Sequence, residues 1–191
     1  MHLSIADLVF PVDRSRLELF RADSRLCWGF VIESTGRTIE GCDWIPQLSS
    51  EVLFETKAGE IESWRHVAPR QVEWSLAATD ETSPHATLYV FEHLFIYNCT
   101  IDLLPLPNGI ELHLQARCDV YFNEQYESNL ALEAECPLNC TVLCGRLNEV
   151  DARRSISPYL AVEDFGFDQD ENGVSRLTTF AGHEVSQDGA R

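Results

Sequence analysis

Glu92 and His93 are the residues whose position most strongly suggests chemistry, because they interrupt an otherwise apolar segment, residues 88–98 (LYVFEHLFIYN). A carboxylate beside an imidazole can accept a proton as a general base or hold a polar ligand. If the segment is a strand covered on both faces, Glu92 needs a cation, water or a proton, since an unpaired buried carboxylate is costly. The pattern therefore marks both residues as candidate binding residues.

Their expected partners lie on residues 110–122, where polar and apolar residues alternate. One face of this predicted strand carries His113, Gln115 and Arg117. The turn sequence Pro107-Asn108-Gly109 precedes it, and the segment between the two strands is expected to connect them as a hairpin. The candidate ligand-binding set is therefore Glu92, His93, His113, Gln115 and Arg117.

The register of this hairpin decides which faces meet, because a shift of one residue exchanges the two faces of a strand. If paired residue numbers add up to an odd value, Glu92 lies opposite Arg117 in a salt bridge. If the sum is even, the aromatic residues of 88–98 share a face with His93 and His113, which suits a sugar or another small polar molecule. An enzyme or isomerase built on these residues would use Glu92 or His93 as the general base and Arg117 to hold an anionic group.

Residues 168–173 (DQDENG) are a weaker candidate, for calcium binding. They match the first half of a calcium loop, but Arg176 and Thr179 occupy the ninth and twelfth positions, and the twelfth needs a bidentate Glu. An acidic hairpin with the turn Asn172-Gly173 explains the segment more simply. The chain also lacks a Cys-x2-Cys pair, a nucleophile motif and a phosphate-binding loop, so we predict neither a metal site nor a cofactor.

The elements that would position these residues are short strands. Period-two alternation and closely spaced turn sequences predict about 10 to 12 antiparallel strands with minor helix. The expected fold is therefore all-β, either a β-sandwich or an open barrel. Short helices are predicted only at Ser4–Val9 and near Asn148–Ser155. Residues 1–182 are expected to form a single mainly-β domain, followed by a polar C-terminal tail, residues 183–191.

The four tryptophans separate into two predicted pairs. Trp28 and Trp74 lie in alternating apolar segments and are expected in the core. Trp44 and Trp64 lie in more polar surroundings, which makes them the candidates for an exposed aromatic platform.

The composition excludes several classes of partner. The net charge is −17, from 31 acidic and 14 basic residues, and the basic residues are interleaved with acidic ones. Nucleic acid and an anionic membrane surface are therefore not expected partners. The chain has no apolar run long enough to span a bilayer, and its first residues lack the features of a signal peptide. Together with an odd number of cysteines, 7, this favours a cytoplasmic protein with free thiols.

The leading functional hypothesis is a non-enzymatic binding or interaction module, since no catalytic constellation stands out. Its strong negative charge suits docking to a basic protein partner, for example as an inhibitor or immunity factor, and a small polar ligand is the other candidate partner. Two alternatives stay open: the enzyme or isomerase described above, and a calycin-like carrier of an apolar molecule inside a barrel.

Overall fold

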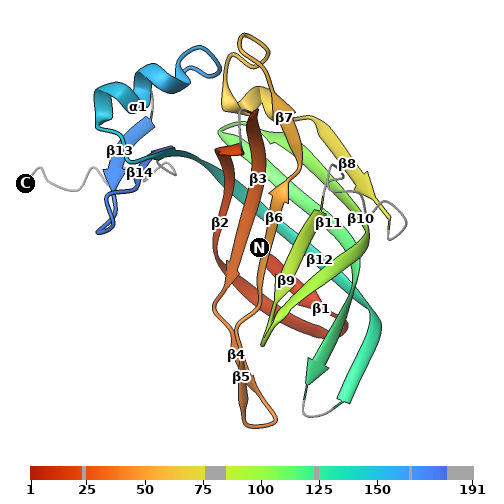
Figure 1. Cartoon of the computed structure of the whole chain (residues 1–191). Helices are drawn as coiled ribbons and strands as arrows, with labels where there is room; N and C mark the ends of the chain where they lie inside the picture. Colours follow the sequence, from red (N-terminus) through yellow and green to blue (C-terminus); the bar gives the residue numbers. More distant parts are fainter. Residues whose placement is uncertain (23–24, 76–84, 123–124, 164, 180–191) are drawn as a thin grey trace, which may run out of the picture.

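The computed structural model describes residues 1–22, 25–75, 85–122, 125–163 and 165–179 (Figure 1). Its strands are β1 (His2–Ile5), β2 (Leu8–Ala22), β3 (Arg25–Ser34), β4 (Arg37–Ile39), β5 (Cys42–Trp44), β6 (Gln47–Val52), β7 (Phe54–Thr56), β8 (Arg70–Trp74), β9 (His85–Tyr89), β10 (His93–Leu106), β11 (Gly109–Phe122), β12 (Gln125–Gly145), β13 (Phe165–Gln169) and β14 (Ser175–Thr179). The helical segments are η1, a 3-10 helix (Trp64–Val67), and α1 (Glu149–Ile156). The predicted all-β class with minor helix is confirmed. The predicted polar tail, residues 183–191, lies outside the described residues.

The large sheet curls into a barrel-like shape (Figure 1). Its strands follow one another in the order β1-β2-β3-β6-β9-β10-β11-β12, and β12 also pairs with β1 and β2. Because β12 and β2 both run antiparallel to β1, they are parallel to each other, and they pair directly beyond the end of β1. The far end of β12 pairs with β14, which brings β13 and α1 to one side of the barrel. This curvature fits the open barrel among the two predicted architectures.

The alternation predicted for residues 110–122 is confirmed in β11 over residues 110–120. Its even-numbered residues from Ile110 to Val120 are buried, and its odd-numbered residues from Glu111 to Asp119 are exposed or half-buried. The same alternation continues on β12, with Glu133 and Glu135 outside. These strands therefore bury one face in the core and present the other to solvent.

The continuous strand predicted for residues 88–98 is wrong. β9 ends at Tyr89 and β10 begins at His93, and the residues between them form a bend. Glu92 is exposed at this bend, so water can satisfy its carboxylate and no buried partner is needed. The two arms of a hairpin can share one apolar composition, and the sequence pattern joined them into a single strand.

The predicted connection before β11 is also wrong, because β10 continues to Leu106. In the β10–β11 register the paired residue numbers add up to an odd value at Thr100 and Gln115, and to an even value at Tyr97 and Arg117. Asn98, with a φ of 48°, lies where the register shifts, as in a β-bulge. Both parities therefore occur on one ladder, and Glu92 belongs to neither.

Of the two predicted helices, the one near Asn148–Ser155 is confirmed as α1. Its first turn is capped by Asn148, whose side-chain oxygen accepts a hydrogen bond from the Asp151 backbone N–H at 3.0 Å. The helix predicted at Ser4–Val9 is wrong, because β1 and β2 meet there in a tight turn at Ala6, where φ is 50°. A short apolar run fits a helix or a strand by periodicity, and pairing with β12 decides for the strand.

All four tryptophans are buried in the core that the inward side chains form. This confirms the prediction for Trp28 and Trp74, whereas the exposed platform predicted at Trp44 and Trp64 is wrong. Trp44 stacks on Phe10 with ring centroids 6.4 Å apart. Trp44 is therefore a core residue of the barrel, although its neighbours in the sequence of the β4–β5 hairpin are polar.

Candidate functional site

The structure divides the predicted ligand-binding residues between two places. Two of them are exposed at and beside the β9–β10 bend, and the other three lie on the outer face of β11, at its half-buried or exposed positions. The first group is Glu92 and His93, and the second group is His113, Gln115 and Arg117.

These two places are far apart along β10. Arg117 is opposite Tyr97, which follows His93 by four positions or about 13 Å of extended strand, and Gln115 is opposite Thr100, which follows His93 by seven positions or about 23 Å. His93 instead pairs with Tyr89, and their ring centroids lie 5.0 Å apart. The five residues therefore do not form one site, and ligand binding at either place stays a prediction.

The outer face of β11 belongs to a regular array of side chains across five strands, β8, β10, β11, β12 and β1. The register of the ladders aligns these side chains in rows. One row contains Gln71, Asp102, His113, Glu135 and His2. The next row contains Glu73, Thr100, Gln115, Glu133 and Ser4.

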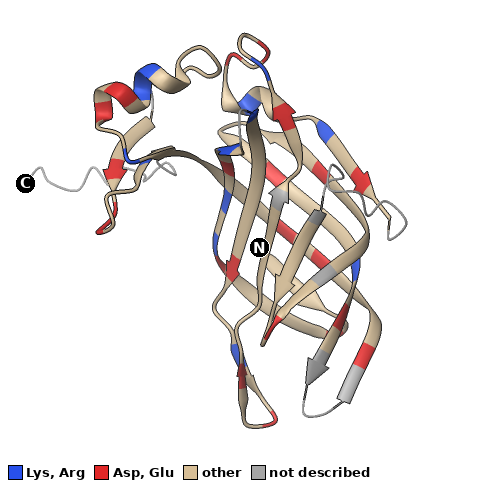
Figure 2. Cartoon of the chain, in the orientation of Figure 1, with Lys and Arg blue, Asp and Glu red and all other residues tan. Residues whose placement is uncertain are grey.

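We name the carboxylates of this array the acidic face: Glu73, Asp102, Glu111, Glu133 and Glu135. They are exposed or half-buried, and Figure 2 shows acidic residues recurring along these strands. The two rows contain no Lys or Arg. Like charges held on a rigid sheet create a negative potential over the whole face.

The contacts within the acidic face leave most of its charge unbalanced. Asp102 Oδ1 accepts a hydrogen bond of 2.8 Å from the Gln71 side-chain amide. His113 Nε2 lies 3.0 Å from Glu111 Oε2. Arg117, at the rim, donates to the backbone carbonyl of Asn129 at 3.4 Å and does not pair with these carboxylates.

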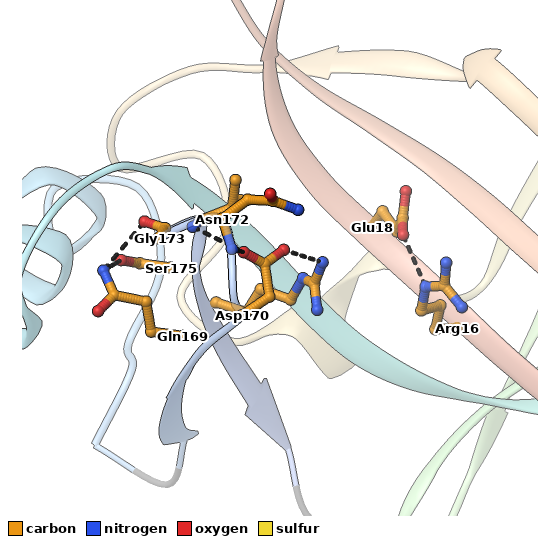
Figure 3. Close-up of polar contacts among 9 residues, drawn as sticks. Arg16, Glu18, Gln169, Asp170, Asn172, Gly173 and Ser175 are labelled. Atoms are coloured by element: carbon orange, nitrogen blue, oxygen red, sulfur yellow. Dashed lines mark hydrogen bonds and ion pairs between the residues drawn. The ribbon is translucent and has the colours of Figure 1, made fainter.

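Carboxylates elsewhere in the described chain commonly contact arginine. On β2, Arg16 reaches Glu18 at 2.6 Å and Glu33 at 3.0 Å, and Figure 3 shows the first of these contacts. Burial lowers the pKa of Arg16, but the hydrogen bonds to the two carboxylates outweigh burial and raise the pKa overall. The acidic face differs from such paired sites because its charges have no arginine partner among the described residues.

The predicted acidic hairpin joins β13 to β14, but its loop spans residues 170–174 instead of a two-residue Asn172-Gly173 turn, and the Gly173 N–H donates to the Asp170 carbonyl at 2.9 Å. Asp170 Oδ1 accepts hydrogen bonds of 2.9 Å from the backbone N–H groups of Asn172 and Val174, and its Oδ2 lies 2.9 Å from the Arg176 guanidinium (Figure 3). The Asp170 oxygens that would have to ligate calcium are thus engaged by the turn itself.

Four of the buried cysteines, Cys99, Cys118, Cys136 and Cys140, do not offer a reactive thiolate. Burial raises the pKa of Cys118 to about 12 and that of Cys136 to about 11, and it also raises the pKa of Cys99 and Cys140. Because the thiolate is the reactive form, these side chains act as small apolar residues of the core.

A hollow of 730 Å³ lies between the outer side of β2 and the segment around α1. Its lining includes Phe20, Val52, Leu143 and Ile156. Its lining also includes the polar residues Glu18, Arg21, Ser50 and Ser155, and none of the predicted ligand-binding residues lines it. The apolar carrier predicted as an alternative would need its ligand inside the barrel, where the inward side chains pack against one another.

The sequence prediction missed the carboxylates that flank His113 on the neighbouring strands. Glu133 and Glu135 alternate with apolar residues as clearly as the residues of β11 do, so their common face could have been found by pairing the two patterns. The position of Asp102 on this face could not have been found in this way, because the segment that contains Asp102 was expected to be a loop.

In comparisons with protein-family models, with curated proteins and with solved structures, nothing matches this chain. Within the described part of the chain, no helix has the length and apolar character needed to cross a membrane.

Proposed function

We propose that this protein is a non-enzymatic binding module that docks a basic protein partner through the acidic face. The observation that carries the proposal is the register that aligns four carboxylates in two rows without an intervening Lys or Arg, with Glu111 in the adjacent row between Leu104 and Pro137. Such a face accelerates association with a positive surface and selects against negative ones. Regular pairing of the backbone holds the face in place, which limits the entropy lost on binding.

Two observations favour this function over the alternatives. The residues that an enzyme would combine, Glu92 with Arg117, lie on different parts of the barrel. The inward side chains pack into a core, which favours a binding module over an apolar carrier. The proposal places the protein in the cytoplasm, since its buried cysteines serve as core residues and need no oxidising compartment.

The test is a pull-down from an extract of the source cells at about 10 mM and about 500 mM salt, because salt shortens the reach of surface charges from about 30 Å to a few ångströms. Retained proteins are identified by mass spectrometry. We expect a basic protein that is retained at low salt and lost at high salt.

A matched pair of variants makes the test specific for the acidic face. The face variant replaces Glu73, Glu133 and Glu135 by Gln, and the control variant replaces Glu62, Glu163 and Glu171, which are exposed elsewhere, by Gln. Both remove three charges, so only docking through the acidic face predicts that the first variant alone loses the partner. Equal loss in both variants, or retention in both, contradicts the proposal.

A further inference from the structure

One part of the acidic face has the composition of a metal site. Glu111, His113 and Glu135 each offer one ligand atom, and these three atoms lie within 4.8 Å of one another. The first two residues project from the same face of β11, and the third lies directly opposite His113 on β12. Oxygen and nitrogen ligands of a common Zn²⁺ ion lie about 2.0–2.2 Å from it, so small side-chain rotations would bring these atoms to coordination distance.

The imidazole distinguishes this group from an ordinary acidic cluster. His113 Nε2 is shielded from solvent although the ring as a whole is partly exposed, and it has no hydrogen-bond partner. Nε2 lies 3.0 Å from Glu111 Oε2, which is close enough for both atoms to ligate one ion. A shielded ring nitrogen this close to a carboxylate oxygen matches the arrangement in which a cation is ligated by both.

A second histidine lies within reach of the same carboxylate. His2 on β1 is the partner of Glu135 on the opposite side of β12, so this carboxylate has a histidine on each neighbouring strand. Side chains of directly opposite residues start about 5 Å apart and share a face of the sheet. The His2 nitrogens are not among the three ligand atoms that lie within 4.8 Å of one another, so a rotation of the His2 side chain would be needed to provide a fourth ligand.

We propose that Glu111, His113 and Glu135, with His2 as the fourth ligand, bind a divalent transition-metal ion such as Zn²⁺ on the outer face of the sheet. Two carboxylates balance the charge of the ion, and imidazole favours zinc over magnesium or calcium. This proposal does not rest on the proposed docking function, although Glu111 and Glu135 also belong to the acidic face.

The test is isothermal titration calorimetry of the full chain with ZnCl₂ alone, and separately with MgCl₂. The protein carries Cys42→Ser, because the exposed Cys42 thiol is itself able to bind zinc. We expect one Zn²⁺ per chain and an affinity for Mg²⁺ that is at least about tenfold weaker. No saturable zinc binding, or equal binding of both ions, would overturn the proposal.

Four further variants locate the ion. Glu135→Gln and His113→Asn are each expected to lower the zinc affinity at least about tenfold, whereas Glu133→Gln, which removes an equal charge from the same strand, leaves it within about twofold. An equal loss with Glu133→Gln would show diffuse attraction to the acidic face and contradict a site. His2→Asn is expected to weaken zinc binding about tenfold, and an unchanged affinity would remove His2 from the site. Circular dichroism of each variant confirms that the fold is retained.

Discussion

Asp170 is a single residue whose carboxylate organises a complete turn. It accepts two backbone hydrogen bonds and contacts Arg176, so replacing it leaves two N–H groups and a guanidinium without their partner. We expect Asp170→Ala to lower the free energy of unfolding by about 2 kcal/mol, measured by urea denaturation.

The matched control for this prediction is Asp168→Ala, two residues earlier. Asp168 is exposed, and its substitution is expected to cost less than about 0.5 kcal/mol. Added calcium should leave the urea midpoint of the wild-type protein unchanged, because the Asp170 oxygens are already engaged. A calcium-dependent increase in the midpoint would restore the calcium interpretation of residues 168–173.

Individual residues also show what the sequence could not reveal. The alternation around His113 fixed its face on β11, since neighbouring side chains of a strand must point to opposite sides. The partners of His113 depended on register, and the bulge at Asn98 changes the parity of that register within one ladder. No local sequence pattern predicted the bulge. The register, and with it the predicted contact of Arg117 with Glu92, could therefore not be decided from sequence.

At the scale of elements, one arginine ties α1 to the segment that follows it. Arg153 contacts Glu149 one turn earlier and donates hydrogen bonds to the backbone carbonyls of Val162 at 2.7 Å and Phe165 at 2.8 Å. It thereby ties the helix to the start of β13. The helix itself was predictable from Asn148 and the residues after it, but this attachment joins segments that the sequence pattern treats separately.

We expect Arg153→Met, which keeps the apolar stem, to lower the free energy of unfolding by about 2 kcal/mol and to speed amide hydrogen exchange in α1. Two carbonyls lose a charged donor in this variant. Arg154→Met is the control, because Arg154 makes an exposed ion pair with Asp151 at 3.1 Å, and such pairs contribute at most about 1 kcal/mol. Similar exchange rates in the two variants would show that Arg153 does not anchor the helix.

The strand prediction for residues 88–98 failed because the chain reverses direction inside this segment. Residues 88–98 contain the end of one strand, a bend and the start of another, all with apolar neighbours. Periodicity detects which side chains share a face, but it does not detect where the chain reverses unless Gly, Pro, Asn or Asp marks the turn. The bend at Glu92 has none of these residues, whereas the turn at Pro107 and Asn108 does, and that turn was correctly placed.

For the whole molecule, the barrel separates two environments with opposite demands. Its interior holds apolar side chains and buried thiols, and the carboxylates gather outside, five of them on the acidic face. A net charge of −17 adds repulsion within the folded state. A basic partner or a bound cation would relieve this repulsion, so both proposals made for the acidic face predict that its ligand also stabilises the fold.

The buried thiols predict how the whole fold responds to alkali. Burial raises the pKa of Cys118 to about 12 and of Cys136 to about 11, and it raises that of Cys99 and Cys140 as well, whereas an unfolded cysteine titrates near about 8.5. Their contribution to stability is therefore complete below about pH 8.5 and is lost as the pH rises toward the folded values, at about 1.4 kcal/mol per pH unit for each thiol. Urea denaturation under reducing conditions at pH 8 to 11 should show this decline in the free energy of unfolding. In Cys140→Ala the slope of that free energy against pH should be smaller by the contribution of one thiol. The exposed Cys42 provides the control, and an equal flattening in Cys42→Ala would mean that burial in the barrel does not cause the decline.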